Sequence, residues 1–73
     1  MVRAKFECTN VSRGVESSSV TLCPVVGGSK ENAEFYRWTP GGSISIEIVR
    51  HETAQHFVPG KQYYVDFTEV KEA

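Results

Sequence analysis

The chain has 73 residues, of which 40% are hydrophobic and 23% charged, and its formal net charge is -1. This length predicts one small β domain over residues 1–73 with a thin core, because a chain of this size buries only about 60% of the surface that it exposes when unfolded. No apolar run approaches the roughly 20 residues of a membrane helix, and a near-neutral charge gives no general attraction to a phosphate backbone. The composition therefore argues against membrane and nucleic-acid partners.

Period-two alternation predicts the first two strands. The first covers about residues 2–9 and turns Phe6 and Cys8 toward the inner face. After a turn at Gly14, a second strand runs as far as Val26. Pro24 lies within it and cannot donate to a ladder, so the end of this strand is expected at an edge or a bulge.

The two cysteines are predicted to be reduced thiols. Cys8 has the parity of the inner residues of the first strand, whereas Cys23 has the parity opposite to the apolar residues of the second. On a regular hairpin the two thiols then point to opposite faces and cannot bond. His51 and His56 match no compact set of metal ligands with them, so we predict neither a metal site nor a cofactor.

The middle of the chain is harder to interpret. The stretch SKENAEF lacks alternation and is expected to be a loop with at most one helical turn capped by Ser29. The rings of FYRW favour an extended segment that ends at Pro40.

As a strand, FYRW has two possible registers. In one, Tyr36 and Trp38 face the core and Arg37 is solvated. In the other, Phe35 and Arg37 face inward, and the remaining two rings form a surface platform. The first register is favoured because it leaves the arginine in water. The second would offer rings for stacking beside a cation.

The rest of the chain predicts one clear strand, a short helix and a last strand. SISIEIV alternates cleanly, with its three isoleucines on one face. Ala54 and Phe57 have helical spacing and predict a short helix before the last strand. That strand turns Tyr63, Val65 and Phe67 inward. The predicted fold is mostly β: a small curled antiparallel sheet or closed barrel of about four to six short strands, with one short helix before the last strand.

The outward residues of the last strand are Tyr64 and Asp66. Tyr63 and Tyr64 are adjacent on a strand and must point to opposite faces, so Tyr64 is expected to be exposed. Asp66 is expected to be a surface carboxylate paired with an arginine or lysine across the sheet. The chain has no nucleophile elbow, no phosphate-binding glycine loop and no close His-Glu-His motif, so it is not expected to be an enzyme.

Two segments, GGSKENAEFYRWTPGGSISIEI and FVPGKQYYVDF, carry a resemblance that covers most of the chain. They resemble a set of small, functionally unassigned accessory proteins of tailed bacteriophages and prophages. The shared positions are Gly28, Ser29, Glu31 and Asn32; Thr39, Pro40 and Gly42; and Phe57, Pro59, Gly60, Lys61, Tyr63, Tyr64, Val65, Asp66 and Phe67. The resemblance implies a phage accessory protein in the bacterial host cytoplasm, a location that the absence of a secretory signal also favours.

These observations suggest a non-enzymatic protein that sequesters or blocks a host factor, with a nucleotide signal of antiphage defence as one candidate ligand. Oligomerisation would stabilise a thin-cored barrel, so a homo-oligomer with a site between copies is expected. The alternatives are a single-stranded nucleic-acid-binding barrel and a structural or virion-associated module. The candidate ligand-binding residues are aromatic, basic or next to the turn: Tyr36, Arg37, Trp38, Thr39, Lys61 and Tyr64.

Overall fold

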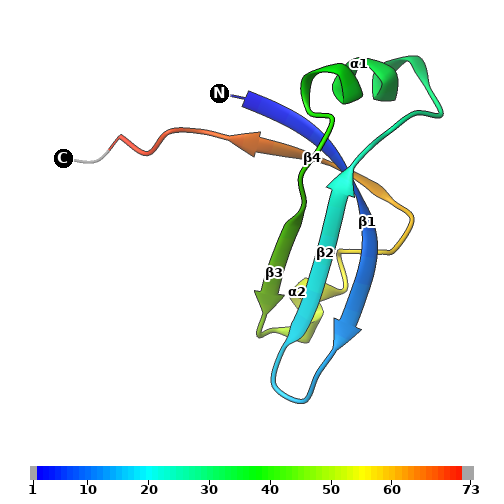
Figure 1. Cartoon of the computed structure of the whole chain (residues 1–73). Coiled ribbons are helices and arrows are strands. Elements are labelled where there is room, and N and C mark those ends of the chain that lie inside the picture. The colour runs from blue at the N-terminus through cyan, green and yellow to red at the C-terminus, as the bar shows by residue number, and fades with distance from the viewer. Residues whose placement is uncertain (1, 72–73) are drawn as a thin grey trace.

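A computed structural model describes residues 2–71 and contains one strongly curled antiparallel sheet (Figure 1). Within these residues the strands are β1 (Val2–Arg13), β2 (Ser18–Pro24), β3 (Ile44–Ile48) and β4 (Gln62–Phe67), in the order β3-β2-β1-β4. Because β3 and β4 form the two edges, the sheet is an open half-barrel. The predicted mostly-β, small curled sheet is confirmed.

The core lies on the inner face of this sheet. β1 and β2 contribute its buried residues, and the opposite edges cover them in part. Cross-strand neighbours in an antiparallel pair share a face, and Phe6 lies opposite Tyr63 while Val20 lies opposite Ile46. The inward-facing residues predicted for β1, β3 and β4 therefore do share the inner face, as predicted. The buried cluster is Ala4, Phe6, Cys8, Val20 and Leu22, with Val11, Ile44, Ile48, Phe57, Tyr63 and Val65 packed against it.

A β-bulge at Thr9 resets the alternation of β1. Cys8 pairs with Leu22, but Asn10 pairs with Thr21, so Thr9 is an extra residue in the ladder. After the bulge the odd-numbered Val11 turns inward and packs against the core. β1 therefore continues to Arg13, beyond its predicted end at residue 9. The prediction stopped too early because the bulge interrupts the alternation of apolar residues on which it depended.

Both cysteines are free thiols, as predicted. Cys8 is buried and pairs with Leu22, whereas the half-buried Cys23 pairs with Glu7, which has the opposite parity. The two thiols therefore lie on opposite faces. Pro24 is the last residue of β2 and lies beyond the reach of β3, whose ladder ends at Leu22, so no partner on that side requires its missing N–H.

The segment predicted as a loop followed by an extended stretch is instead a helix, α1 (Lys30–Trp38). Ser29 caps it, because its side chain accepts a hydrogen bond from the backbone N–H of Asn32 at 3.1 Å. Glu31 in the first turn and Arg37 in the last turn both favour the helix dipole. These end signals override the strand propensity of the rings. The two strand registers considered for FYRW are both wrong, since strand parity does not apply to a helix.

A second, shorter helix, α2 (His51–Ala54), precedes β4. Ala54 is buried, and Phe57 packs against the core just after the helix ends. The short helix predicted before the last strand is thus only this one turn, and the longer helix lies between β2 and β3. The following loop is fastened to β1 at Gly60, whose φ of +92° suits glycine and whose N–H donates to the carbonyl of Cys8 at 2.8 Å.

The molecule exposes more surface than a compact protein of its mass. Its accessible surface is 5508 Å², against about 4,500 Å² for a compact 8.1 kDa monomer, an excess of about 1,000 Å². The radius of gyration is 13.7 Å, against about 11 Å for a compact chain of this length. The curl of the sheet and the projecting pair formed by the start of β1 and the end of β4 account for this shape (Figure 1). No helix in the described part of the chain is long and apolar enough to cross a membrane.

Candidate functional site

Tyr64 is the centre of a side-chain cluster on the outer face, where α1 meets β1 and β4. The guanidinium carbon of Arg3 lies 4.8 Å from the centroid of the Tyr64 ring, and the ammonium nitrogen of Lys5 lies 5.6 Å from it. The ring of Phe35 approaches from α1, with its centroid 6.0 Å away. The Tyr64 hydroxyl donates a hydrogen bond to the Glu31 carboxylate. We call these five residues the Tyr64 cluster.

The charges of the Tyr64 cluster are compensated by near neighbours. Arg3 donates two hydrogen bonds to Asp66, at 2.6 and 3.0 Å, and Lys5 lies 3.5 Å from Glu31. The bond from Arg3 lowers the pKa of Asp66. The bond from Tyr64 lowers the pKa of Glu31, and the same bond raises the pKa of the tyrosine. The expectation that Asp66 is a paired surface carboxylate is confirmed, and the cluster fastens α1 to the sheet.

The lowered pKa of Asp66 predicts a specific acid dependence of stability. The Arg3–Asp66 pair stabilises the fold above the ordinary carboxyl pKa of about 4, and this contribution is lost as the pH falls through the lower folded-state value. We expect Asp66→Asn to flatten the fall in unfolding free energy between about pH 5 and pH 2, measured by urea denaturation. Glu69→Gln, in the exposed C-terminal tail, should keep the wild-type slope. An unchanged slope in Asp66→Asn would contradict the pairing.

The predicted ligand-binding residues are only partly brought together. Trp38 is 70% exposed, and its ring meets the edge of Phe35 at 6.3 Å, which links it to the Tyr64 cluster. Tyr64 is exposed as predicted, and Tyr36 is exposed where the favoured register had put it in the core. The remaining three predicted residues make other contacts. Arg37 lies 3.6 Å from Glu34, and Thr39 is the C-cap of α1. The backbone carbonyl of Lys61 accepts a hydrogen bond from the N–H of Cys8.

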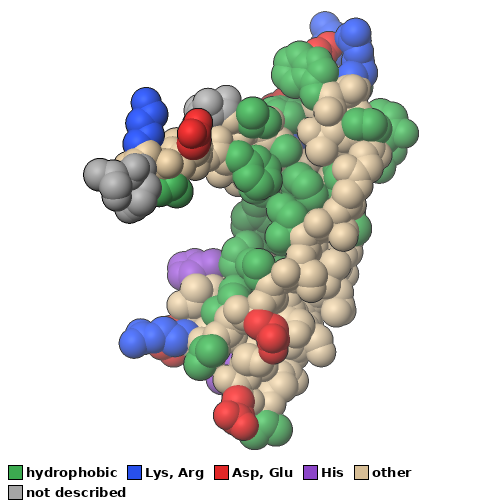
Figure 2. Space-filling view, turned by 60° about the vertical axis from the view of Figure 1, so that its left-hand side comes forward, with side chains coloured by type: hydrophobic (Ala, Val, Ile, Leu, Met, Phe, Trp, Pro, Cys, Tyr) green, Lys and Arg blue, Asp and Glu red, His purple; other side chains and the backbone are tan. Residues whose placement is uncertain are grey.

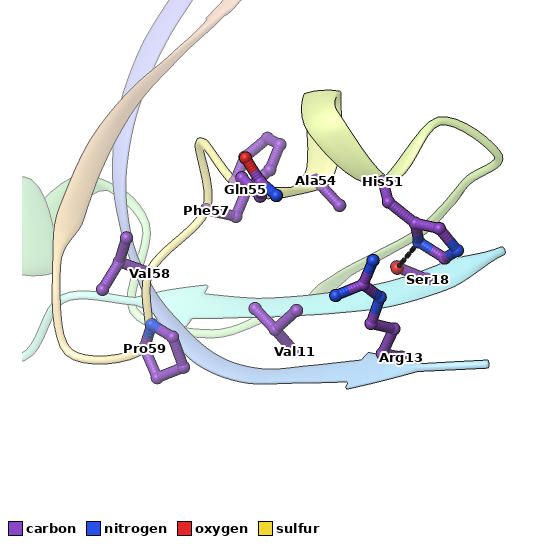
Figure 3. A pocket seen from close by; sticks show the side chains of 9 residues that line it. All are labelled: Val11, Arg13, Ser18, His51, Ala54, Gln55, Phe57, Val58 and Pro59. Carbon is purple, nitrogen blue, oxygen red and sulfur yellow. Dashed lines mark hydrogen bonds between the residues drawn. The ribbon is translucent and has the colours of Figure 1, made fainter.

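A pocket that the sequence did not predict lies between α2 and the hairpin formed by β1 and β2 (Figure 3). We call it the α2 pocket; its volume is about 280 Å³, close to the lower end of the range for ligand pockets. The hydroxyl oxygen of Ser18 lies 3.0 Å from Nδ1 of His51, in a hydrogen bond across the pocket wall. The lining residues are Val11, Arg13, Ser18, His51, Ala54, Gln55, Phe57, Val58 and Pro59.

The α2 pocket is apolar over most of its wall and polar at one end. Figure 3 shows Arg13 and His51 near each other at that end, with Val58 and Pro59 at the other. Among the described residues Arg13 has no ion-pair partner. An apolar wall that ends in an uncompensated guanidinium suits a ligand with a flat ring and an anionic group.

A larger apolar groove runs along the hollow face between the two edge strands. Figure 2 shows its hydrophobic side chains as a continuous stripe across the middle of the molecule. The groove has a volume of about 420 Å³, its lining is mostly apolar or aromatic, and Tyr64 and Asp66 also border it. Its floor consists of Leu22, Ile44, Ile46, Phe57, Tyr63 and Val65.

No protein-family model matches the chain, and no curated protein and no solved structure matches it either. The inference about function therefore depends on the α2 pocket, the apolar groove and the Tyr64 cluster.

Proposed function

We propose that the protein is a non-enzymatic binding protein that sequesters a small, anionic, nucleotide-like ligand in the α2 pocket. The observation that supports this is Arg13, a cation without an ion-pair partner among the described residues, at one end of an apolar hollow. A ring of the ligand would lie against Val11 and Phe57. Its phosphate would meet the guanidinium, whose parallel N–H donors match phosphate oxygens.

His51 and Ser18 would orient the ligand. Ser18 is buried, and its hydroxyl holds the imidazole through Nδ1. The other ring nitrogen, Nε2, is then free to exchange a hydrogen bond with a polar edge of the ligand's ring. A few convergent polar groups on an apolar wall are typical of small-molecule sites.

The resemblance to phage accessory proteins supports a ligand made by the bacterial host, and a nucleotide signal of antiphage defence is the class that we propose. Sequestration acts by stoichiometric capture and needs no catalytic group. We also propose that the protein works in the host cytoplasm and as a homo-oligomer, since the excess surface of about 1,000 Å² is what a partner subunit would cover.

A second candidate function is supported by the exposed rings of α1. Tyr36 and Trp38 could stack on the bases of a single strand. Against it, Arg37 is close to Glu34 and Arg3 is bound to Asp66, so both of these arginines are already paired with carboxylates. This candidate predicts binding that weakens steeply with salt, whereas capture by one guanidinium in a pocket weakens little.

Arg13→Ala is expected to weaken nucleotide binding by about 10- to 100-fold, because a hydrogen bond to a charged group contributes about 1.5–3 kcal/mol. Isothermal titration calorimetry with adenosine monophosphate and with a cyclic dinucleotide measures this. Arg37→Ala is the matched control, since this arginine is exposed on α1, and it should bind as the wild type does. Failure of both probes to bind the wild type would contradict the proposal. So would a loss of binding in Trp38→Ala that Arg13→Ala does not share.

A further inference from the structure

The outer edge of β3 has few of the features that keep an edge strand from pairing. This strand pairs with β2 on one side, and no strand within residues 2–71 pairs with its other side. Its five residues, Ile44–Ile48, include no proline, lysine or arginine, and its register with β2 has no bulge. Its one charged residue, Glu47, accepts a hydrogen bond from Ser17. Natural sheets usually block exposed edges with such devices, because an open edge pairs readily with another strand.

The other edge strand is less suited to pairing. β4 carries Asp66, which is engaged by Arg3, and its aromatic Tyr63 is held by the preceding loop. The hydroxyl of Tyr63 donates to the carbonyl of His56 and accepts from the N–H of Val58, both at 2.8 Å. Side chains of β4 are thus engaged by the loop and by the ion pair, whereas β3 presents a row of isoleucines.

We propose that a second copy of this chain pairs with β3, antiparallel and across a two-fold axis at Ile46. This register sets Ile46 opposite Ile46 of the second copy and Ile44 opposite its Ile48. On the outer face Ser45 meets Glu47 of the second copy. Each apolar side chain then faces an apolar one and no like charges meet, as a self-complementary interface requires.

Apolar side chains of β3 and of the residue after it are exposed where the second copy would pair. Ile46 remains 39% exposed although it lies at the middle of its strand, and Val49, just after β3, is exposed as well. Pairing would join two half-barrels into one eight-stranded sheet, with the apolar grooves side by side. The inference rests on the proposed self-association and does not depend on the ligand.

The decisive experiment exploits the two-fold axis at Ile46. By size-exclusion chromatography with light scattering, the wild type should have twice the chain mass of 8.1 kDa. Ile46→Lys and Ile46→Glu each set like charges opposite one another, so each variant alone should be monomeric, with the dissociation constant raised at least tenfold. Mixing the two variants should restore a dimer with one copy of each. Val15→Lys, at a 97% exposed position in the turn after β1, is the matched control and should remain dimeric.

A second pair of variants tests the register on the exposed outer face, where folding is not at risk. Ser45→Glu sets a carboxylate opposite Glu47 of the second copy and should weaken the dimer, whereas Ser45→Lys should preserve or strengthen it. A monomeric wild type, a dimer that survives Ile46→Lys, a mixture that stays monomeric, or equal dimerisation of the two Ser45 variants would each overturn the inference. Because all these masses are measured without nucleotide, a failure here is distinct from a failure of ligand binding.

Discussion

Phe6→Ala is expected to leave the protein mostly unfolded at 25 °C. Phe6 is buried in the middle of the sheet, where it lies opposite Tyr63 on β4 and Pro24 on β2. Truncating a buried phenylalanine costs about 3–5 kcal/mol. The whole unfolding free energy of a 73-residue domain is about 4–11 kcal/mol, and the thin core puts this protein toward the lower value.

Circular dichroism during urea titration measures this loss. The wild type should unfold in one cooperative transition, and Phe6→Ala should lack the folded baseline. Val2→Ala is the matched control, since Val2 has the same inward parity on β1 but is exposed, and it should change stability by less than about 0.5 kcal/mol. A cooperative transition in Phe6→Ala with a loss below about 1 kcal/mol would show that the core is not centred on this ring.

The alternation of the strands was predictable because each has one buried face. Ile44, Ile46 and Ile48 share a side with the core residues of β2, and Tyr63 and Val65 face the core from β4. A period of two records this burial directly in the sequence. The pairing of Asp66 and the exposure of Tyr64 followed from the same parity.

The helix α1 could not be predicted from the ring-rich segment, because its stability depends on contacts with distant residues. Phe35 packs on Tyr64, and Glu31 binds both Tyr64 and Lys5. Local propensity favours a strand for these rings, and a nine-residue helix is marginal in isolation. Of the local end signals of α1, the cap at Ser29 was identified from the sequence, whereas the charges of Glu31 and Arg37 were not interpreted as helix signals.

The α2 pocket was missed for a different reason. The bulge at Thr9 turns Val11 toward the core, and the pocket depends on this change of face. The sequence shows that the alternation is interrupted there, but it does not show which residue is the extra one in the pairing of β1 with β2. The approach of His51 to Ser18 is likewise a matter of where α2 lies on the sheet, 33 residues further along the chain.

Asn32→Asp is expected to destabilise the protein by about 3 kcal/mol at pH 7, because it puts a carboxylate into a buried site opposite the carbonyl oxygen of Gly27. Asn32 is only 3% exposed. Its amide nitrogen donates to the carbonyl of Gly27 at 2.9 Å and to Oε1 of Gln62 at 3.4 Å, while its buried Oδ1 has no hydrogen-bond partner among residues 2–71. An aspartate would face the carbonyl of Gly27 with an acceptor of its own and would lose the hydrogen bond that fixes α1 there.

The sign of the pH dependence separates this mechanism from a simple loss of packing. Burial raises the pKa of the new carboxyl above its unfolded value of about 4, so protonation restores a donor toward Gly27, and the loss relative to wild type should shrink from pH 7 to pH 5. Urea unfolding followed by fluorescence of Trp38, the only tryptophan, reports on α1 directly. Glu34→Gln, on the exposed side of α1, should behave as the wild type does at both pH values. An equal loss at pH 5 and pH 7 would mean that the position does not depend on the donor to Gly27, and that α1 is held to the sheet chiefly by the Tyr64 cluster.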